Sequence, residues 1–82
     1  MTAEKVRYEY DPEADAVYIY LSDEPYGYGV DLDPERRVDF SQDRTPIGVE
    51  LRCLRTGVDI SGLPMNDRIA EILEEIQATA RA

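Results

Sequence analysis

Apolar and polar residues alternate along most of the first 55 positions, and this period of two predicts a sheet. Lys5–Tyr10 alternates charged and apolar side chains, as a strand with one buried face does. Asp11–Asp15 combines a proline with aspartates and predicts a turn. The run that follows, Ala16–Ser22, is the most continuously apolar in the sequence and predicts a second strand. The side chains that we expect on its core face are Val17, Ile19 and Leu21.

Three further segments have the composition of strands: Tyr26–Asp33, Arg37–Ser41 and Ile47–Leu54. The first of them alternates strictly, with Tyr26, Tyr28, Val30 and Leu32 on one side and glycines and aspartates on the other. Its glycines predict a bulge, or a place where another backbone or a ring lies close. In the last segment, Cys53 continues the apolar alternation, so we expect it to be a small buried residue.

The apolar period changes at about residue 65 and becomes that of an amphipathic helix ending near residue 80. The expected apolar stripe consists of Ile69, Ile72, Leu73, Ile76 and Ala80. Asn66 or Asp67 is the expected N-terminal cap. Burying four Ile or Leu side chains contributes roughly 6–12 kcal/mol before entropy, which is comparable to the net stability of a whole domain. We therefore expect the helix to dock, either on its own sheet or on a second subunit.

These patterns predict an α+β fold: a five-stranded antiparallel β-meander with one C-terminal amphipathic helix on its aliphatic face. We expect one domain over residues 1–82, with strands over about 5–55, a connector over 56–64 and the helix over about 65–80. Every second side chain from Val6 to Leu54 should then be hidden beneath the helix. A chain of 82 residues has a modest core, and one cysteine with no histidine supplies neither a disulfide nor a zinc site. Oligomerisation is the remaining way to add stability.

The charge of the chain disfavours nucleic acid as a partner. There are 18 acidic and 9 basic residues, giving a formal net charge of −9, whereas nucleic-acid binding depends on basic residues that neutralise phosphates. Half of the acids lie between Arg7 and Arg36, where no lysine or arginine occurs. Such a patch either steers a basic protein or is a solvated rim. No apolar run approaches the roughly 18 residues of a membrane span, and the N-terminus lacks a signal-peptide core, so we expect a cytoplasmic protein and no membrane.

Candidate chemistry is sparse, and we expect no catalytic, cofactor-binding or metal-ligating residues. The serines and Cys53 have no histidine as a base, and no calcium loop is complete. An alternative hypothesis is a small-ligand or enzyme site that uses Asp11, Asp15 and Asp31 around a tyrosine-lined cleft. That site requires convergent carboxylates with raised pKa values in a concave surface.

The tyrosines are the most distinctive feature, since all six lie between positions 8 and 28. Four explanations account for this clustering of tyrosines. They can pair across neighbouring strands, be covered by another part of the chain, or stack on a small ligand. They can also form an interface, because tyrosine is enriched there. The candidate interface residues are Tyr18, Tyr20, Tyr26, Tyr28, Asp11 and Asp15. The leading hypothesis is a non-enzymatic protein–protein interaction module that acts as a homo-oligomer, most simply a homodimer.

Several of these residues form a recognisable signature. The first part consists of Tyr10-Asp11, Asp15, Tyr18-Ile19 and Leu21-Ser22 at fixed spacing. The second consists of Val38, Phe40, Gly48–Leu51 and Gly57–Pro64. From Val6 to Leu63 the chain resembles a family of small prokaryotic proteins catalogued as domain of unknown function 2283.

The resemblance implies a compact antiparallel sheet protein without an established activity. Some relatives are encoded beside small ribonuclease-like toxins, which implies an antitoxin-like neutraliser of a small basic ribonuclease as an alternative function. The chain departs from the family pattern in its Tyr-Gly-rich third strand and in the turn Asp43–Pro46, which replaces an Asp-Gly type turn.

Overall fold

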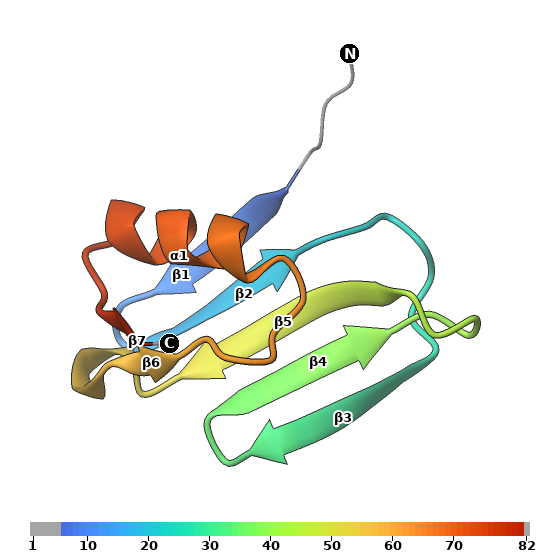
Figure 1. Ribbon diagram of the computed structural model, residues 1–82, viewed down its shortest axis with the longest axis horizontal. Helices are drawn as coiled ribbons and strands as arrows, with labels where there is room; N and C mark the ends of the chain where they lie inside the picture. Colours follow the sequence, from blue (N-terminus) through green and yellow to red (C-terminus); the bar gives the residue numbers. More distant parts are fainter. Residues whose placement is uncertain (1–5, 82) are drawn as a thin grey trace.

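The computed structural model describes residues 6–81 of the chain (Figure 1). The strands of the main sheet are β1 (Arg7–Asp11), β2 (Ala16–Tyr20), β3 (Tyr28–Asp33), β4 (Arg36–Phe40) and β5 (Pro46–Arg52). They are followed by a 3₁₀ turn η1 (Leu54–Thr56), a short strand β6 (Val58–Asp59), the helix α1 (Asn66–Glu75) and a short strand β7 (Ala80–Arg81). Lys5, with which the first strand was expected to begin, lies outside the described residues.

The main sheet is antiparallel throughout, and its strand order is β1-β2-β5-β4-β3. The predicted α+β class, with a five-stranded antiparallel sheet and a C-terminal helix, is confirmed. The strand order departs from the predicted meander, because β5 lies between β2 and β4. β5 has consecutive buried residues, Ile47, Gly48 and Val49, and therefore small or apolar groups on both of its faces. A strand of this kind belongs in the middle of a sheet.

The core lies between the sheet and α1. Val17 and Ile19 of β2 are buried, as predicted, and join Val49 and Leu51 of β5 in one apolar cluster. The helix adds three fully buried residues to the same cluster: Ile69, Ile72 and Leu73. The helix thus docks on its own sheet, over the β1–β2–β5 half (Figure 1).

The helix is shorter than predicted and ends at Glu75 rather than near residue 80. Gln77 adopts a left-handed conformation with φ of 64°, and its N–H donates to the carbonyl of Glu74. The N–H of Ala78 donates to the carbonyl of Leu73 at 2.8 Å, which completes a Schellman motif. The chain then turns back, and Ala80 pairs in parallel with Val58 instead of continuing the helical stripe.

The start of the helix also differs from the prediction. The N-cap residue is Met65, which is left-handed with φ of 54° and has no side-chain cap hydrogen bond. Its carbonyl accepts the N–H groups of Arg68 and Ile69. Asp67 lies in the first turn, where a negative charge is favourable for the helix dipole. Neither Asn66 nor Asp67 is the cap, because the chain becomes helical at Asn66.

Cys53 is exposed, so the prediction that it is buried is wrong. β5 ends at Arg52, and Cys53 takes a left-handed conformation with φ of 58° before η1. The alternation that placed Cys53 inward therefore stops one residue before it. The next residue, Leu54, fills the core position instead.

The glycines before and within β3 lie where other groups come close, as predicted. A Cβ atom added to Gly27 would lie 2.6 Å from the backbone nitrogen of Gln42. A Cβ atom added to Gly29 would lie 2.1 Å from a terminal nitrogen of Arg37. The register of β3 against β4 also shifts between Asp31 and Asp33, which adds an irregularity at the end of the strand.

None of the helical segments within residues 6–81 has the length and apolar character needed to cross a lipid bilayer.

Candidate functional site

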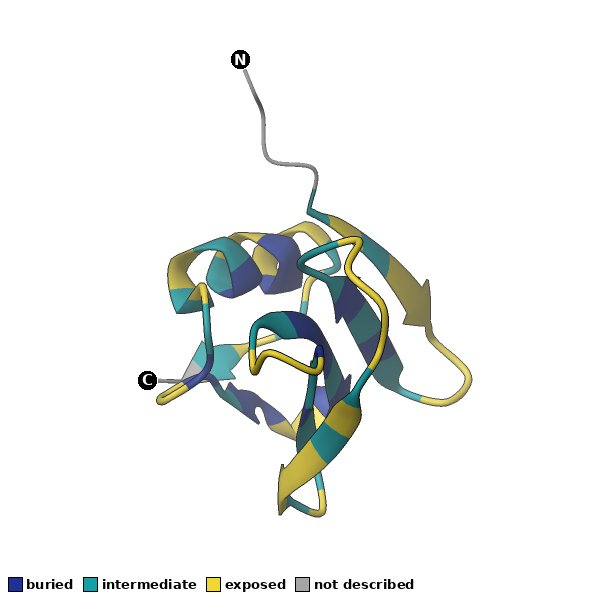
Figure 2. Cartoon of the chain, turned by 90° about the vertical axis from the view of Figure 1, so that its right-hand side faces the viewer, coloured by how far each residue is buried: buried dark blue, intermediate teal, exposed yellow. Residues whose placement is uncertain are grey.

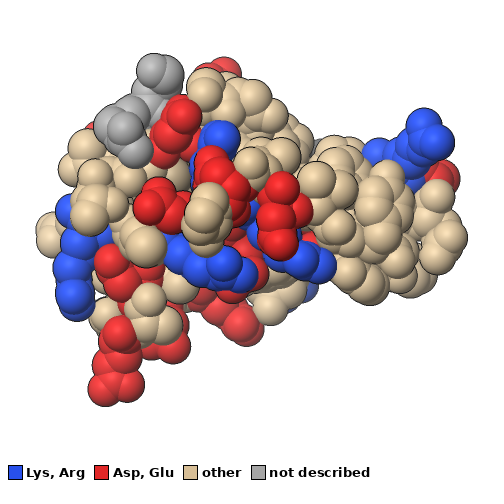
Figure 3. Space-filling view, turned by 90° about the horizontal axis from the view of Figure 1, so that it is seen from below, with Lys and Arg blue, Asp and Glu red and all other residues tan. Residues whose placement is uncertain are grey.

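The face of the sheet opposite α1 is polar, and its side chains form rows that run across all five strands. One row consists of Glu9, Tyr18, Glu50, Arg37 and Asp31, and the next consists of Arg7, Tyr20, Gly48, Asp39 and Gly29. Acidic and basic side chains are interspersed on this side of the molecule (Figure 3). Opposite charges on neighbouring strands stabilise such a face modestly.

Tyr18 lies across the middle of this polar face. Its hydroxyl donates a hydrogen bond to Asp39 at 2.7 Å, two strands away. Gly48 makes this possible, because a Cβ atom there would lie 1.9 Å from the Tyr18 hydroxyl oxygen. Partial burial, and then the hydrogen bond to Asp39, raise the pKa of Tyr18 well above its ordinary value. The phenol therefore stays protonated as a hydrogen-bond donor.

Arg37 of β4 links β3 to β4 on the same face. Its guanidinium donates to Asp39 at 3.0 Å, to Asp31 at 3.3 Å and to the hydroxyl of Tyr26 at 3.2 Å. The hydrogen bond to Asp39 is the largest cause that raises the pKa of Arg37. The absence of a side chain at Gly29 leaves room for the guanidinium. Arg37 thereby connects Asp31 of β3, and Tyr26 before it, to the hydrogen-bonded network of the polar face.

Tyr20 occupies the β1 end of the polar face. Its ring meets that of Tyr18 edge-on, with centroids 4.8 Å apart, and the guanidinium carbon of Arg7 lies 4.6 Å from the Tyr20 centroid. Partial burial and the neighbouring Glu9 raise the pKa of the Tyr20 hydroxyl. Tyr18 and Tyr20 thus lie on the face away from the core, as predicted, but both belong to an internal network.

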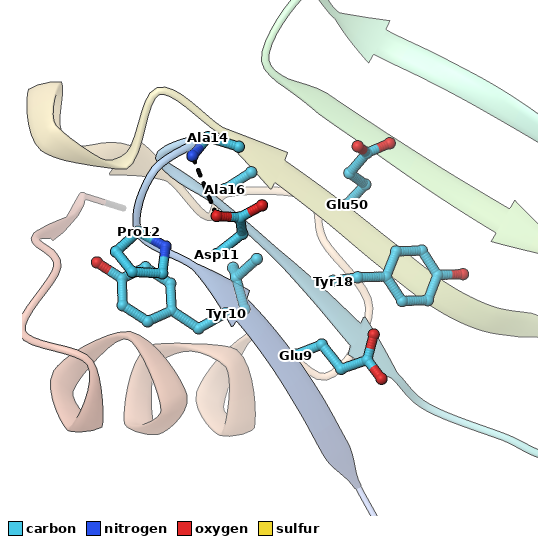
Figure 4. A pocket seen from close by; sticks show the side chains of 9 residues that line it. Glu9, Tyr10, Asp11, Pro12, Ala14, Ala16, Tyr18 and Glu50 are labelled. Atoms are coloured by element: carbon cyan, nitrogen blue, oxygen red, sulfur yellow. Dashed lines mark hydrogen bonds between the residues drawn. The ribbon is translucent and has the colours of Figure 1, made fainter.

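A hollow of about 540 Å³ opens beside the β1–β2 hairpin. Tyr18 lies there between Glu9 and Glu50, with Asp11 at the hairpin end (Figure 4). The Asp11 carboxylate accepts the N–H groups of Glu13 and Ala14 and so closes the turn. The hollow is shallow and acidic, which suits a cationic group better than an anion or an apolar ligand.

The three aspartates of the alternative ligand-site hypothesis do not converge. Asp11 lies at the β1–β2 hairpin, while Asp31 lies on β3, at the opposite edge of the sheet. Asp15 accepts the N–H of Arg55 and holds the hairpin against η1. Each carboxylate is engaged locally, and none of the three main hollows formed by residues 6–81 contains all three. Among the described residues, no group of three or more Cys, Asp or Glu side chains is arranged to hold a metal ion.

The six candidate interface residues also do not share one face. Tyr26 precedes β3 and reaches Arg37 on the polar face, whereas the ring of Tyr28 stacks on Phe40 on the core side at 5.2 Å. The predicted shared face of Tyr26 and Tyr28 is therefore wrong. The strand begins only at Tyr28, so its alternation does not extend back to Tyr26.

The apolar side of β3 is the surface that sequence reasoning missed. Tyr28, Val30 and Leu32 are exposed rather than hidden beneath the helix. Val30 and Leu32 line one side of an apolar groove of about 340 Å³, and Leu63 and Pro64 line the other. We call this surface the β3 groove; its lining residues are Val30, Leu32, Val38, Phe40, Pro46, Gly62, Leu63 and Pro64.

The width of a single helix was the signal that could have shown that part of the sheet stays uncovered. One helix is about 10 Å wide, whereas five strands spaced by about 4.8 Å span about 19 Å between the outer two. One short helix therefore cannot cover all of the sheet. The exposed residues of β3 stand out beyond the covered core (Figure 2).

These features define a small α+β protein whose antiparallel sheet has one polar face and one face that a single helix covers in part. The model of the family described as "Protein of unknown function (DUF2283)" matches residues 7–51, more than half of the chain. The protein belongs to this family. No curated protein and no solved structure is significantly similar to the chain. The matched segment comprises the main sheet from β1 to within β5, and lies before the helix and the Gly62–Pro64 side of the β3 groove.

Proposed function

We propose that the protein is a non-enzymatic protein–protein interaction module that acts as a homo-oligomer. The observation that carries this proposal is the β3 groove with its exposed apolar rim. Val30 and Leu32, which line the groove, are 41% and 43% exposed, and Tyr28 of the same strand is 39% exposed, although all three are large apolar side chains. Monomeric proteins rarely expose a contiguous apolar patch without a use for it. The polar face, by contrast, pairs several of its own side chains internally, as Tyr18 and Arg37 do with Asp39.

The edge position of β3 supports the same proposal. β3 is the last strand of the sheet, and an exposed edge strand with an apolar face is a template for association. The missing cover for the β3 groove can be supplied by another subunit. A chain of this size, with a modest core, also gains stability by burying more apolar surface.

Size-exclusion chromatography with light scattering tests the proposal on the full chain. We expect a concentration-dependent dimer at tens of micromolar protein. Val30→Lys should make the protein monomeric, because it places a charge in the apolar rim. Tyr10→Lys is the matched control, since Tyr10 is equally exposed, at 41%, but lies on the other edge strand, β1. A wild-type protein that stays monomeric throughout this range contradicts the proposal.

A second candidate function is an antitoxin-like neutraliser of a small basic protein, and the acidic hollow favours it. Glu9, Asp11 and Glu50 surround that hollow, and the chain carries a net charge of −9. Electrostatic attraction of this kind weakens with salt. Self-association of an acidic chain should instead strengthen with salt, because salt screens the repulsion between copies.

Binding to a small basic ribonuclease, measured at low and high salt, distinguishes the two candidates. If the hollow binds the basic protein, Glu9→Gln/Glu50→Gln should weaken that complex, while Val30→Lys should not. A small basic protein encoded in the neighbouring reading frame is the expected genetic counterpart, and a lone gene argues against this candidate.

A further inference from the structure

We propose that two copies pair through their β3 strands, antiparallel about a two-fold axis at Val30, so that their sheets join into one. This inference rests on the proposed homo-oligomeric function and adds the partner, the strand that pairs and the register. It follows from the edge position of β3, from its self-complementary sequence and from the position of Arg37 of β4 against Gly29.

Of the two edge strands, β3 is the one suited to pairing. β1 carries Arg7 and Glu9 along its polar side, and its Tyr8 hydroxyl donates to Glu75 of the helix at 3.0 Å. Charged side chains on an edge discourage pairing. β3 begins with Tyr28, Gly29 and Val30, which carry no charge, and its apolar face is open. Its two aspartates, Asp31 and Asp33, are each paired with an arginine of β4. A second strand can therefore approach β3 with less desolvation of charge.

The sequence of β3 is complementary to itself in one antiparallel register. With the two-fold axis at Val30, Val30 lies opposite Val30 of the second copy. On the same face, Tyr28 lies opposite Leu32 of the second copy, and this pair occurs twice. Aromatic and aliphatic side chains directly opposite each other stabilise an antiparallel pair. The two exposed apolar stripes thus become one continuous strip beside both β3 grooves.

The charged side of β3 is also complementary in this register. Gly29 lies opposite Asp31 of the second copy, and the guanidinium of Arg37 already lies against Gly29. The Asp31 side chain pairs with Arg37 of its own chain at 3.3 Å, but it is 64% exposed and can also accept from this second guanidinium. Moving the two-fold axis by one residue, to Asp31, places Asp31 opposite Asp31 of the second copy instead, and like charges directly opposite destabilise a pair.

The size of the contact predicts a reversible dimer. One pair of six-residue strands with one apolar stripe per copy is smaller than the interface of a permanent dimer. The repulsion between two chains of net charge −9 weakens it further at low salt. Dissociation on dilution is therefore part of the expectation.

Disulfide cross-linking of single-cysteine variants tests the register. The background is Cys53→Ser, because Cys53 is exposed and would form its own cross-links. In this background Val30→Cys should cross-link rapidly under mild oxidation, since opposite residues have Cα atoms about 4.5–5.5 Å apart. Asp31→Cys is the matched control: in the proposed register its two copies are diagonal, at about 7–8 Å, beyond ready disulfide reach.

Light scattering on the same proteins separates this inference from the proposed function. A dimer by light scattering with cross-linking at residue 30 and not at residue 31 supports the inference. A dimer that cross-links at residue 31 instead, or at neither position, overturns the β3 register and leaves the homo-oligomer standing. A monomer at all concentrations, with no cross-linking at either position, overturns both.

Discussion

The two halves of the sheet present similar apolar side chains in different surroundings. The row Tyr8, Ile19, Val49, Val38 and Val30 crosses all five strands on the helix side. Under α1, Ile19 and Val49 are fully buried, while Val30 at the far edge is 41% exposed. The difference lies in what covers each position and not in the residue type. Burial on this face follows the cover given by α1 and by the connector from Leu54 to Leu63, which together also bury Val38 of β4. The exposed edge at β3 is where we expect binding.

The largest expected effect comes from the same substitution made in both halves. Val49→Ala should lower the free energy of unfolding by about 2 kcal/mol or more, because it removes fully buried methyl groups and leaves a cavity. Val30→Ala should change it by less than about 0.5 kcal/mol at concentrations where the protein is monomeric. Chemical denaturation of dilute protein measures both. Equal losses at the two positions would contradict the difference in cover.

The polar face offers a second matched pair, Gly48 and Gly29, which lie in the same cross-strand row. Gly48→Ala should lower the free energy of unfolding by about 1–3 kcal/mol, because the new Cβ atom would clash with the Tyr18 hydroxyl oxygen, 1.9 Å away. Gly29→Ala should cost less, since the atom that it meets is the movable end of Arg37.

Tyr18→Ala in the Gly48→Ala background checks the cause of this loss. It removes the clash, so the double variant should be more stable than the sum of the two losses predicts. Strict additivity would argue against the contact.

The hydrogen bond between Tyr18 and Asp39 gives a smaller, pH-dependent effect. Tyr18→Phe should cost about 1 kcal/mol at neutral pH. The folded protein raises the pKa of Tyr18 above its ordinary value of 10.0, so the stability from this proton is complete below pH 10 and is lost as the pH rises further. Tyr18→Phe should flatten this alkaline decline. Urea unfolding at a series of alkaline pH values provides the measurement.

The smallest effect is expected in the loop between β4 and β5. The Ser41 hydroxyl and the Thr45 hydroxyl and N–H donate to Asp43, and the Ser41 bond is the first cause that lowers the pKa of Asp43 below its usual 3.8. This stability is present above pH 3.8 and is lost as the pH falls towards the lowered pKa. Asp43→Asn should weaken the acid dependence of unfolding, measured by urea unfolding at a series of acidic pH values.

The sequence predicted the faces of single strands better than the arrangement of the strands. Successive side chains of a strand point to opposite faces. The alternation of Val17 and Ile19 with Tyr18 was therefore enough to predict which face of this strand lies against the core. Alternation does not say which strands are neighbours, so the central place of β5 was missed. It also fails where the backbone leaves the extended conformation, as at Cys53. The helical period fails in the same way at Gln77, where a left-handed residue follows the end of the helix.

The contacts of the candidate site join residues that are far apart in the sequence, so local patterns could not predict them. Tyr18 and Tyr20 were placed on the outer face correctly, but the Tyr18 partner, Asp39, is 21 residues away and is reached only because β5 brings Gly48 between them. The β3 groove requires the loop at Leu63 to return beside Val30, which no pattern within either segment indicates.

A dilution series of two-dimensional amide NMR spectra tests most directly whether the uncovered half of the sheet is the binding surface. We expect the amide signals that shift with protein concentration to cluster in Tyr28–Asp33 and around the β3 groove, at Phe40 and Leu63, while those of β1 and α1 stay constant. Concentration-dependent shifts confined to β1 or to the hollow at the β1–β2 hairpin, or none at all, would contradict the account.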